Sequence, residues 1–194
     1  MLISRHSSAP WSARSPSILG ERVQVRPAAP DDLPAIHGIY SHHVLNGLAS
    51  FEERPPPVEE MRRRFDDVRS RGLPYLAADF GGVLAGYGYC APYRSRSAYR
   101  YSLEDSVYVR HGSEGRGVGS ALLRELIDRC EVLGYRSVIA VIGDSGNSAS
   151  INLHAAFGFL RVGTLRSAGF KFGRWVDSVL MQRMLGPGDA TPPS

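Results

Sequence analysis

Residues 106–123 read SVYVRHGSEGRGVGSALL, and this stretch decides the fold. It begins as a strand, and from Val118 onward its apolar residues recur at helical spacing. Between the two lies a glycine-rich turn, in which backbone N–H groups can point inward because no Cβ atoms obstruct them. The helix that follows adds the positive end of its dipole, so the segment is suited to hold a phosphate or pyrophosphate. A turn needed only for tight packing between strand and helix remains an alternative.

The chain on either side of this turn alternates between strand and helix patterns. Apolar runs flank Phe80-Gly81-Gly82 and predict a β-hairpin, while the continuous apolar run at 137–142 is typical of a buried strand. The order of elements predicts an α/β fold. The expected elements are a strand at 23–26, helices from about 30 and over 58–71, strands at 74–79, 83–92 and 99–109, a helix after Gly119, a strand at 137–142, a helix capped near Asn147, and strands at 160–165 and 172–184.

Length and composition limit the classes of protein that fit. A chain of 194 residues with 43% hydrophobic residues is sufficient for a single domain. The formal charge of +4 suits a phosphorylated cofactor about as well as a nucleic acid, so composition alone does not choose between them. Because the charge is spread along the chain and not gathered in a basic tract, we expect no nucleic-acid partner. Cys90 and Cys130 form no CxxC pattern, so neither a metal site nor a disulfide framework is indicated. With no long apolar run, we expect a cytoplasmic protein without membrane contact.

Both ends of the chain differ in composition from its middle. Residues 1–20 are rich in Ser, Arg and Pro, and residues 186–194 are rich in Pro and Gly. Neither stretch shows periodicity, so we predict disordered tails at 1–20 and 186–194 around a domain at 21–185. A transit peptide or an over-extended start remains an alternative for the first tail.

Several separated segments carry a resemblance to one enzyme family. They are SLEDSVYV (102–109), the glycine turn, GNSASINLHAAFGF (146–159) and AGFKFGRWVDSVLMQ (168–182). On these segments the chain resembles the GNAT superfamily of N-acetyltransferases, and within it the phosphinothricin and methionine sulfone/sulfoximine acetyltransferases. The resemblance implies a mixed, mostly antiparallel central sheet flanked by helices, with acetyl-CoA as co-substrate and no metal. It also implies a homodimer.

The resemblance further implies how acetyl-CoA is held. The strand before the glycine turn diverges from its neighbour, and the pantetheine arm occupies the gap between them. Where the family has Gln or Arg, this chain has Glu114, which is unfavourable near a pyrophosphate. We therefore expect an outward-turned Glu114 or weaker cofactor binding, with Arg116 supplying compensating charge. The implied cofactor contacts are Val107, Tyr108, Val109, Gly115, Arg116, Gly117, Val118, Gly119, Ser120 and Asn147.

Two residues are candidates for the chemistry. Glu104 matches a glutamate that serves as general base in the resembling enzymes, and strand alternation puts it on one face with Ser106 and Tyr108. An exposed or salt-bridged glutamate is the alternative. His154 matches a family histidine that could polarise the carbonyl, relay a proton or orient the substrate, although a packed helix histidine fits equally well. Ile151 stands where many relatives have a tyrosine acid, so the proton donor to the thiolate stays open.

The acceptor is expected beside the strand that carries Glu104. The resemblance assigns substrate contact to Ser97, Ala98 and Tyr99, with Arg94 or Arg96 as supporting cations, and a solvated basic turn is the alternative. Further candidates for the pocket or dimer interface are Phe51, Lys171 and Trp175, although the last two are more often structural. We treat His42, His43 and His111 as surface residues, because they lack the spacing of metal ligands.

These features together predict an N-acetyltransferase. It would move an acetyl group from acetyl-CoA to the amino group of a small amino-acid-like substrate, by direct attack in a ternary complex. Two alternatives are a non-catalytic acyl-CoA-binding sensor and a peptide or protein N-acetyltransferase. The intact Glu104 segment disfavours the first, and the modest charge disfavours the second.

Overall fold

The computed structural model describes residues 22–193. Its strands are β1 (Gln24–Pro27), β2 (Tyr75–Phe80), β3 (Val83–Pro92), β4 (Ser102–Val109), β5 (Ser137–Gly143), β6 (Leu160–Lys171) and β7 (Arg174–Met184). Its α-helices are α1 (Leu33–Asn46), α2 (Val58–Ser70), α3 (Val118–Val132) and α4 (Ser148–Ala156), and short 3-10 turns lie at Pro30–Asp32 and Ser97–Tyr99.

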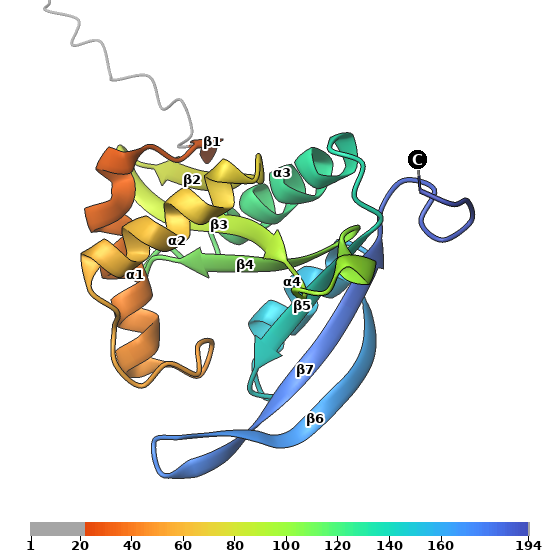
Figure 1. Ribbon diagram of the computed structural model, residues 1–194. Coiled ribbons are helices and arrows are strands. Elements are labelled where there is room, and N and C mark those ends of the chain that lie inside the picture. The colour runs from red at the N-terminus through yellow and green to blue at the C-terminus, as the bar shows by residue number, and fades with distance from the viewer. Residues whose placement is uncertain (1–21, 194) are drawn as a thin grey trace, which may run out of the picture.

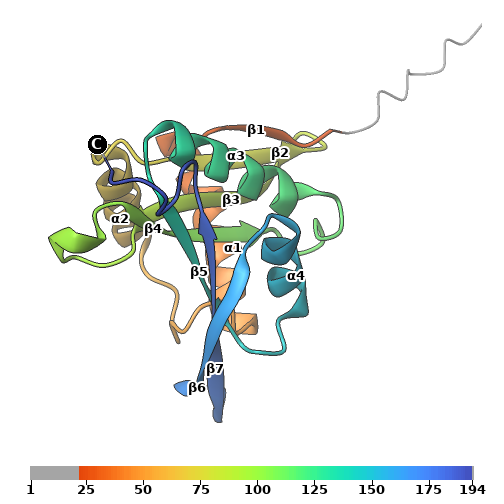
Figure 2. The same ribbon diagram turned by 90° about the vertical axis from the view of Figure 1, so that its right-hand side faces the viewer.

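The strands are neighbours in a single twisted sheet. Within residues 22–193, seven strands pair in the order β1-β2-β3-β4-β5-β7-β6. β4 and β5 are parallel, and the other neighbouring pairs are antiparallel. Helices α1 and α2 cover one face of this sheet, and α3 and α4 cover the other (Figures 1 and 2). The predicted α/β fold, a mixed and mostly antiparallel sheet flanked by helices, is confirmed.

Helix α3 is anchored to the sheet by the apolar stripe that its sequence predicts. Leu122, Leu123 and Leu126 are at most 1% exposed, and each contributes about 2 kcal/mol by leaving water. The helix approaches closely because β3 carries a glycine where the two meet. A Cβ atom on Gly86 would lie 2.8 Å from Cγ1 of Val118. The first turn of α3 is therefore held directly against β3.

The sheet opens between β4 and β5. Their parallel register ends at Asp105↔Ala140, although β3 keeps pairing with β4 and β7 with β5 to the ends of both strands. Figure 1 shows the two strands running apart from a shared corner. We call the space between residues 106–109 and 141–143 the wedge. The divergence that the family resemblance implied is therefore present in this chain.

Two features around β3 and β4 were predicted with different success. The hairpin turn is confirmed, because Gly81 and Gly82 both have positive φ, at 60° and 78°. The start of the next strand was predicted wrongly at residue 99. Residues Ser97–Tyr99 instead form a 3-10 turn, in which Tyr99 N donates to Arg96 O at 3.0 Å, and β4 begins afterwards.

The C-terminal hairpin is longer than its sequence pattern indicated. Residues 166–171, predicted as a connection, belong to β6. The pairing with β7 shifts register between Leu165 and Gly169, and Ser167 has a left-handed φ of 52°. This irregularity breaks the alternation by which a strand is detected in sequence.

Of the two predicted tails, only the C-terminal one lies among the residues that the structure describes. The tail at 1–20 lies outside the described residues. The segment from 186 is described as far as residue 193, and the guanidinium of Arg136 donates to Gly188 O, Thr191 Oγ1 and Pro192 O at 3.2–3.4 Å. The predicted domain bounds of 21–185 remain a prediction.

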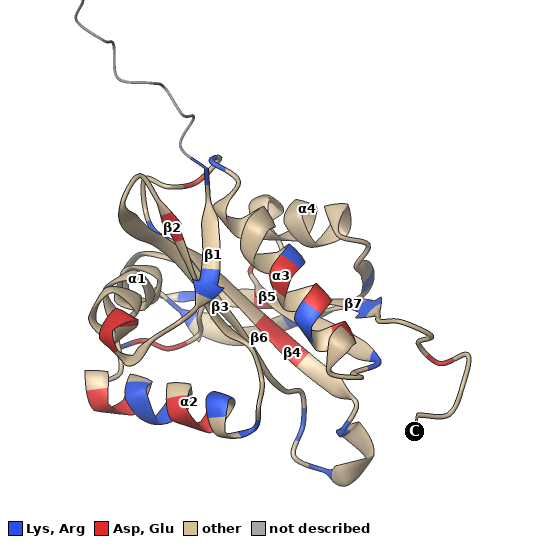
Figure 3. Cartoon of the chain, turned by 90° about the horizontal axis from the view of Figure 1, so that it is seen from above, with Lys and Arg blue, Asp and Glu red and all other residues tan. Residues whose placement is uncertain are grey.

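Charged side chains lie on helices and loops over much of the surface, as the alternating colours of α2 and α3 in Figure 3 show. The acidic segment of β4, in the middle of the sheet, is an exception (Figure 3). None of the described helices has both the length and the apolar character needed to cross a bilayer.

Candidate functional site

The wedge is a narrow cavity walled by two strand ends and a helix. Its sides are residues 106–108 of β4 and 141–143 of β5, and it is closed by Asn147, Ser150 and His154. Because β3 and β7 pair with the outer edges of these strands, the inner edges present backbone N–H and C=O groups to the wedge. An extended chain with amide groups of its own could pair with them.

The glycine turn leads from β4 to the first turn of α3. Gly115 and Gly117 have φ of 72° and 82°, in the left-handed region that favours glycine. Ala121 N, which donates to Gly117 O at 2.9 Å, closes the first helical bond. Backbone N–H groups ahead of it lack partners within the helix and, with the helix dipole, favour an anion here. The turn has the features of the phosphate site that its sequence predicts.

Two charged side chains on this turn lie away from its centre. Glu114 turns back on its own loop, where its Oε2 accepts from Gly112 N at 2.7 Å, and its Oε1 lies 3.6 Å from His111 Nδ1. Arg116 was expected to compensate the charge of Glu114. Its Cζ lies 5.3 Å from the ring centroid of Phe80, at the end of β2, and its role beside a bound diphosphate stays a prediction.

Helix α4 begins as its sequence predicts. The side chain of Asn147 caps the helix by accepting from Ser150 N at 3.2 Å. The cap satisfies a backbone donor that the helix itself leaves unpaired. Both residues also line the wedge, so the cap fixes the helix start against the cavity.

Glu104 lies half-buried just before the wedge, on the face that α1 and α2 cover. The predicted alternation of β4 holds, since the ring of Tyr108 meets that of Tyr40 in α1 with centroids 5.2 Å apart. Burial, and then the negative charge of Asp105, raise the pKa of the Glu104 carboxyl, while Arg94 opposes this. A carboxyl of raised pKa is a better proton acceptor near neutral pH.

Asp105 was not among the residues predicted for the site from the sequence. Its side chain is 2% exposed, and its Oδ2 lies 3.0 Å from Nε2 of His154. Strand alternation could have identified it. The alternation puts this carboxylate between Leu103 and Val107, on the face of the sheet that α3 and α4 cover, and a charge buried there needs a partner.

His154 has both ring nitrogens beside acceptors of the protein. Nδ1 donates to Ser150 O at 2.7 Å, and Nε2 faces Asp105. Burial lowers the pKa of the imidazole, but the hydrogen bond and charge of Asp105, with the Ser150 carbonyl, outweigh burial and raise it. The pair therefore favours an imidazolium beside a carboxylate.

Tyrosine rings cover the sheet beside Glu104. Tyr75 lies nearly parallel to Tyr89 at 5.0 Å, and Tyr87 nearly parallel to Tyr108 at 5.2 Å. Burial raises the pKa of all four phenols, so these rings are neutral near pH 7. Tyr75 and Tyr87 are at most 5% exposed and belong to the core, so only the partly exposed Tyr89 and Tyr108 are available to contact a small polar molecule.

The predicted acceptor loop lies at the start of β4, on the same end as Glu104. Tyr93 N donates to Ser102 O at 3.2 Å and so ties the loop to the strand, and the guanidinium of Arg94 stacks over the Tyr93 ring at 4.8 Å. Arg94 acts electrostatically on Glu104. The remaining predicted residues of this loop are exposed: Arg96, Ser97, Ala98 and Tyr99.

A segment between α1 and α2 is fastened to β6 by a buried lysine. Lys171 is 2% exposed, and its Nζ donates to Gly47 O at 2.9 Å and Ser50 O at 2.7 Å. The next residue, Phe51, lies so close to β6 that a Cβ atom on Gly169 would be 2.6 Å from its ring. The structural interpretation of Lys171 is favoured by these contacts.

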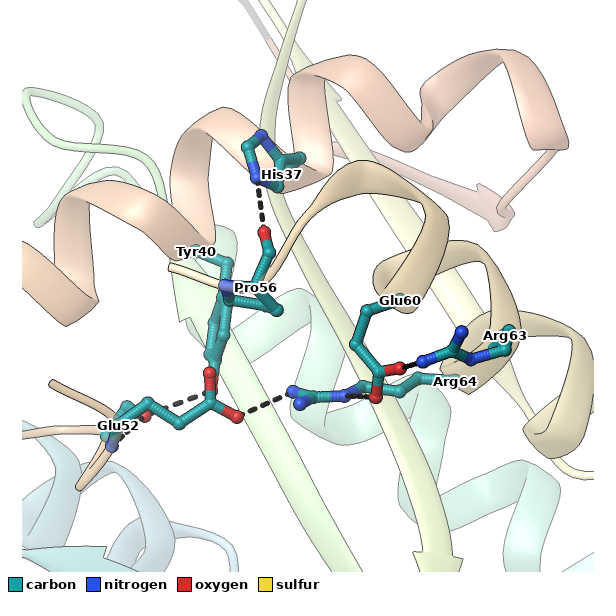
Figure 4. A network of polar contacts seen from close by, with 8 residues as sticks. His37, Tyr40, Glu52, Pro56, Glu60, Arg63 and Arg64 are labelled. Carbon is teal, nitrogen blue, oxygen red and sulfur yellow. Dashed lines mark hydrogen bonds and ion pairs between the residues drawn. The ribbon is translucent and has the colours of Figure 1, made fainter. Parts of the chain in front are cut away.

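A polar network continues this fastening toward α2 (Figure 4). Tyr40 and Ser50 share a hydrogen bond of 2.9 Å between their hydroxyls. Arg64 then bridges Glu52 and Glu60 with contacts of 2.7 and 2.8 Å. The segment that carries Phe51 is thus held from both sides over the face on which Glu104 lies.

The prediction that three histidines lie on the surface was wrong for His43. This residue is half-buried, and its Nε2 donates to Val109 O, the last carbonyl of β4, at 2.8 Å. It follows Tyr40 and Ile39 by one helical turn, and so continues the buried stripe of α1. His42 stacks on the exposed His111 with centroids 4.7 Å apart.

The two cysteines are free and buried. A hydrogen bond with Cys130, together with burial, raises the pKa of the Cys90 thiol well above its usual range. A thiol in that state is a poor nucleophile. Among residues 22–193, no three His, Cys, Asp or Glu side chains are grouped so that they could hold a metal ion.

Comparisons with known proteins agree with this geometry. Residues 39–159 match the model of the acetyltransferase (GNAT) family. The chain is 54% identical over 192 residues to a phosphinothricin N-acetyltransferase of Alcaligenes faecalis, covering 96% of this chain and 98% of that protein. It is 38% identical over 169 residues to an L-methionine sulfoximine/L-methionine sulfone acetyltransferase of Pseudomonas aeruginosa, covering 87% and 98% of the two chains.

A solved structure provides a comparison of the folds. A GNAT superfamily phosphinothricin acetyltransferase from Sinorhizobium meliloti, in complex with AcCoA, superposes with a TM-score of 0.86 at 46% identity. The match covers 89% of this chain and 93% of that one.

The buried pair of Asp105 and His154 predicts a pH-dependent stability. Because the folded pKa of His154 is raised, the pair stabilises fully below the unfolded value of about 6.5, and its contribution is lost as pH rises through the folded value. Asp105→Asn should lower the free energy of unfolding by about 3 kcal/mol near pH 6, and by less near pH 9. Urea denaturation at both pH values checks this.

The exposed Asp128 on α3 provides the matched control. Asp128→Asn should change stability by less than about 0.5 kcal/mol at either pH. An Asp105→Asn loss that stays constant from pH 6 to pH 9 would contradict the ion pair.

Proposed function

Because the chain belongs to the acetyltransferase (GNAT) family, we propose that it transfers the acetyl group of acetyl-CoA to the amino group of a small amino-acid-like substrate. The relatives are named for phosphinothricin and for methionine sulfoximine and sulfone, which are amino acids with a polar distal group. The observation that carries the proposal is the wedge, because its β4 side lies in the chain between Glu104, just before it, and the glycine turn, which follows the strand.

Acetyl-CoA fits this arrangement. The diphosphate would lie against the N–H groups at residues 115–120, and the pantetheine amides would pair with the inner edges of β4 and β5 at Val107, Tyr108 and Val109. Asn147 would bound the arm from α4. The thioester would then lie near the corner where the strands meet, beside Glu104.

The chemistry requires a neutral amine and a place for its proton. An α-amino group has a pKa of about 8, so a carboxylate of raised pKa need only shift a modest equilibrium. In our proposal Glu104 takes this proton, directly or through water. The nitrogen then attacks the thioester carbonyl, the C–N bond forms, and the C–S bond breaks. Counted from the ammonium form, two protons leave the nitrogen: Glu104 takes the first before attack, and the second, lost once the C–N bond has formed, balances the proton that joins the sulfur of CoA.

Acceptor recognition is proposed for the face covered by α1 and α2. Arg94, with its neighbour Arg96, would attract an anionic or strongly polar distal group, and Ser97, Ala98 and Tyr99 would form the rim. The partly exposed rings of Tyr89 and Tyr108 would form the floor, and Phe51 would bound the other side. These groups suit a free amino acid better than an extended peptide.

We also propose a cytoplasmic location and a homodimer. Two unpaired thiols, Cys90 and Cys130, support the first, since oxidising compartments favour disulfides. The β6–β7 hairpin, which reaches beyond the rest of the domain (Figure 1), supports the second. Its large exposed apolar residues include Leu160, Val162, Leu165, Phe170, Phe172 and Trp175. A second copy of this chain would cover them.

The proposed activity is tested by release of CoA thiol from acetyl-CoA. The acceptors are phosphinothricin, methionine sulfoximine, methionine sulfone, free amino acids and a peptide. We expect thiol release with at least one of the small acceptors and none above background with the peptide. Binding of acetyl-CoA in calorimetry without thiol release would establish the sensor alternative, and faster release with the peptide would establish the peptide transferase.

Removing the proposed base should separate catalysis from donor binding. Glu104→Gln keeps the size of the side chain but cannot accept the proton, so kcat should fall by roughly 100- to 10,000-fold while the acetyl-CoA Kd changes little. Steady-state kinetics and calorimetry measure the two quantities. Glu131→Gln, at an exposed position of α3, is the control. A kcat near that of the control would remove Glu104 from this role.

The homodimer is tested at Trp175, which is 66% exposed and packs on Phe170 with centroids 5.3 Å apart. Trp175→Glu places a charge where the apolar partner surface would lie, so sedimentation should change from dimer to monomer. Val132→Glu, at an 88% exposed site on α3, should leave the dimer intact. Sedimentation of the unaltered chain as a monomer would refute the dimer.

A further inference from the structure

Asp105 is the last residue of β4 that pairs with β5. Its register partner is Ala140, and beyond this pair the strands separate. The side chain is 2% exposed and its residue lines the wedge. A carboxylate buried at the corner of the functional cavity is costly unless it is paired, so its presence calls for an explanation.

One oxygen of this carboxylate ties α4 to β4. Oδ2 lies 3.0 Å from Nε2 of His154, whose Nδ1 donates to Ser150 O. The ring packs edge-on against Phe159, with centroids 5.0 Å apart and planes at 88°. Because the imidazole is held on three sides, it has little freedom to swing into the cavity. The pair fixes the helix at the point where the two strands part.

The second carboxylate oxygen of Asp105, Oδ1, is buried and has no hydrogen-bond partner among the described residues. The charged or titratable groups that face this carboxylate are His154 from α4, Cys90 from β3 and Glu104 along its own strand. Glu104 in turn faces Arg94 from the loop after β3.

Resting on the proposed acetyl transfer, we propose that Asp105 is a positioning residue of this site: paired with His154, it holds α4 and the wedge against β4 and keeps a buried negative charge beside Glu104. Asp105 is adjacent to Glu104 and nearer to it than the imidazolium is, so the part of its charge that His154 does not offset disfavours ionisation of Glu104 and makes that carboxylate a stronger base. His154 acts through this pair, with both nitrogens engaged, and touches no reacting atom. The proton that Glu104 takes from the amine passes through neither member of the pair.

The first test reads the charge effect directly. The ionisation of Glu104 is followed by the carbon-13 shift of its side-chain carboxyl, assigned by its loss in Glu104→Gln. In Asp105→Asn the midpoint should fall, because the nearer, negative member of the pair is removed, and it should fall by less than loss of an isolated charge would give, because the imidazolium of His154 offsets part of that charge. Asp105→Ser removes the same charge with a smaller side chain and should give the same shift. Asp128→Asn, at an exposed site, should leave the midpoint unchanged.

The second test measures whether Asp105 and His154 act as a pair in catalysis. Asp105→Asn and His154→Gln should each lower kcat/KM for the amine about tenfold, and the double variant should lose no more than about twofold beyond the larger single loss. Losses that multiply would overturn the pairing. An unmoved Glu104 midpoint in both Asp105 variants, even with reduced stability, would overturn the charge effect. Absence of acetyl transfer in the unaltered chain would instead refute the proposed function, and the carbon-13 midpoints would still decide the role of Asp105.

Discussion

The separation of β4 from β5 is the constraint on which the remaining structure depends. A sheet saturates the backbone groups of its inner strands, and here two inner strands pair only as far as Asp105 and Ala140. Beyond that point each strand is supported on its outer edge alone. The resulting wedge leaves main-chain donors and acceptors open to a ligand in the middle of the sheet, and the other functional elements are arranged around it.

Three anchors keep this opening from collapsing or widening. Helix α3 packs directly on β3 because Gly86 allows close approach, which fixes the glycine turn at the far end of β4. His43 satisfies the carbonyl of Val109, the last residue of β4. The Asp105–His154 pair holds α4 at the corner. The first anchor joins a helix to β3, the neighbour of β4, and the other two join helices to β4 itself, so one wall of the cavity is set by rigid elements, as a preorganised site requires.

The two faces of β4 place its two adjacent carboxylates, Glu104 and Asp105, in different electrostatic surroundings. On the face of α1 and α2, Glu104 is half-buried among neutral phenols, so its proton affinity is raised without full loss of solvent. On the opposite face, Asp105 is buried and paired with an imidazole. Two adjacent carboxylates in one strand thus meet different surroundings, which is how a protein gives similar groups different roles.

The sequence by itself determined the elements and the chemistry that depends on local pattern. The glycine turn before an amphipathic helix, the cap at Asn147 and the alternation that separates Glu104 from Val107 all follow from neighbours within a few residues. Most strands and helices were predicted for the same reason. The register shift in β6 and the 3-10 turn at Ser97–Tyr99 interrupt such patterns. The end of β6 and the start of β4 were therefore not predicted correctly.

Only the tertiary structure decided which distant groups meet. Asp105 and His154 are 49 residues apart in sequence, and Lys171 lies 121 residues from the Ser50 carbonyl that it binds. His43 and Arg116 contact partners on other elements, and the sequence did not predict these contacts. Local pattern fixes the face on which a side chain lies. The packing of helices across the sheet determines which charged group or hydrogen-bond acceptor lies beside that side chain. This packing depends on contacts between residues far apart in the sequence, which no short stretch contains.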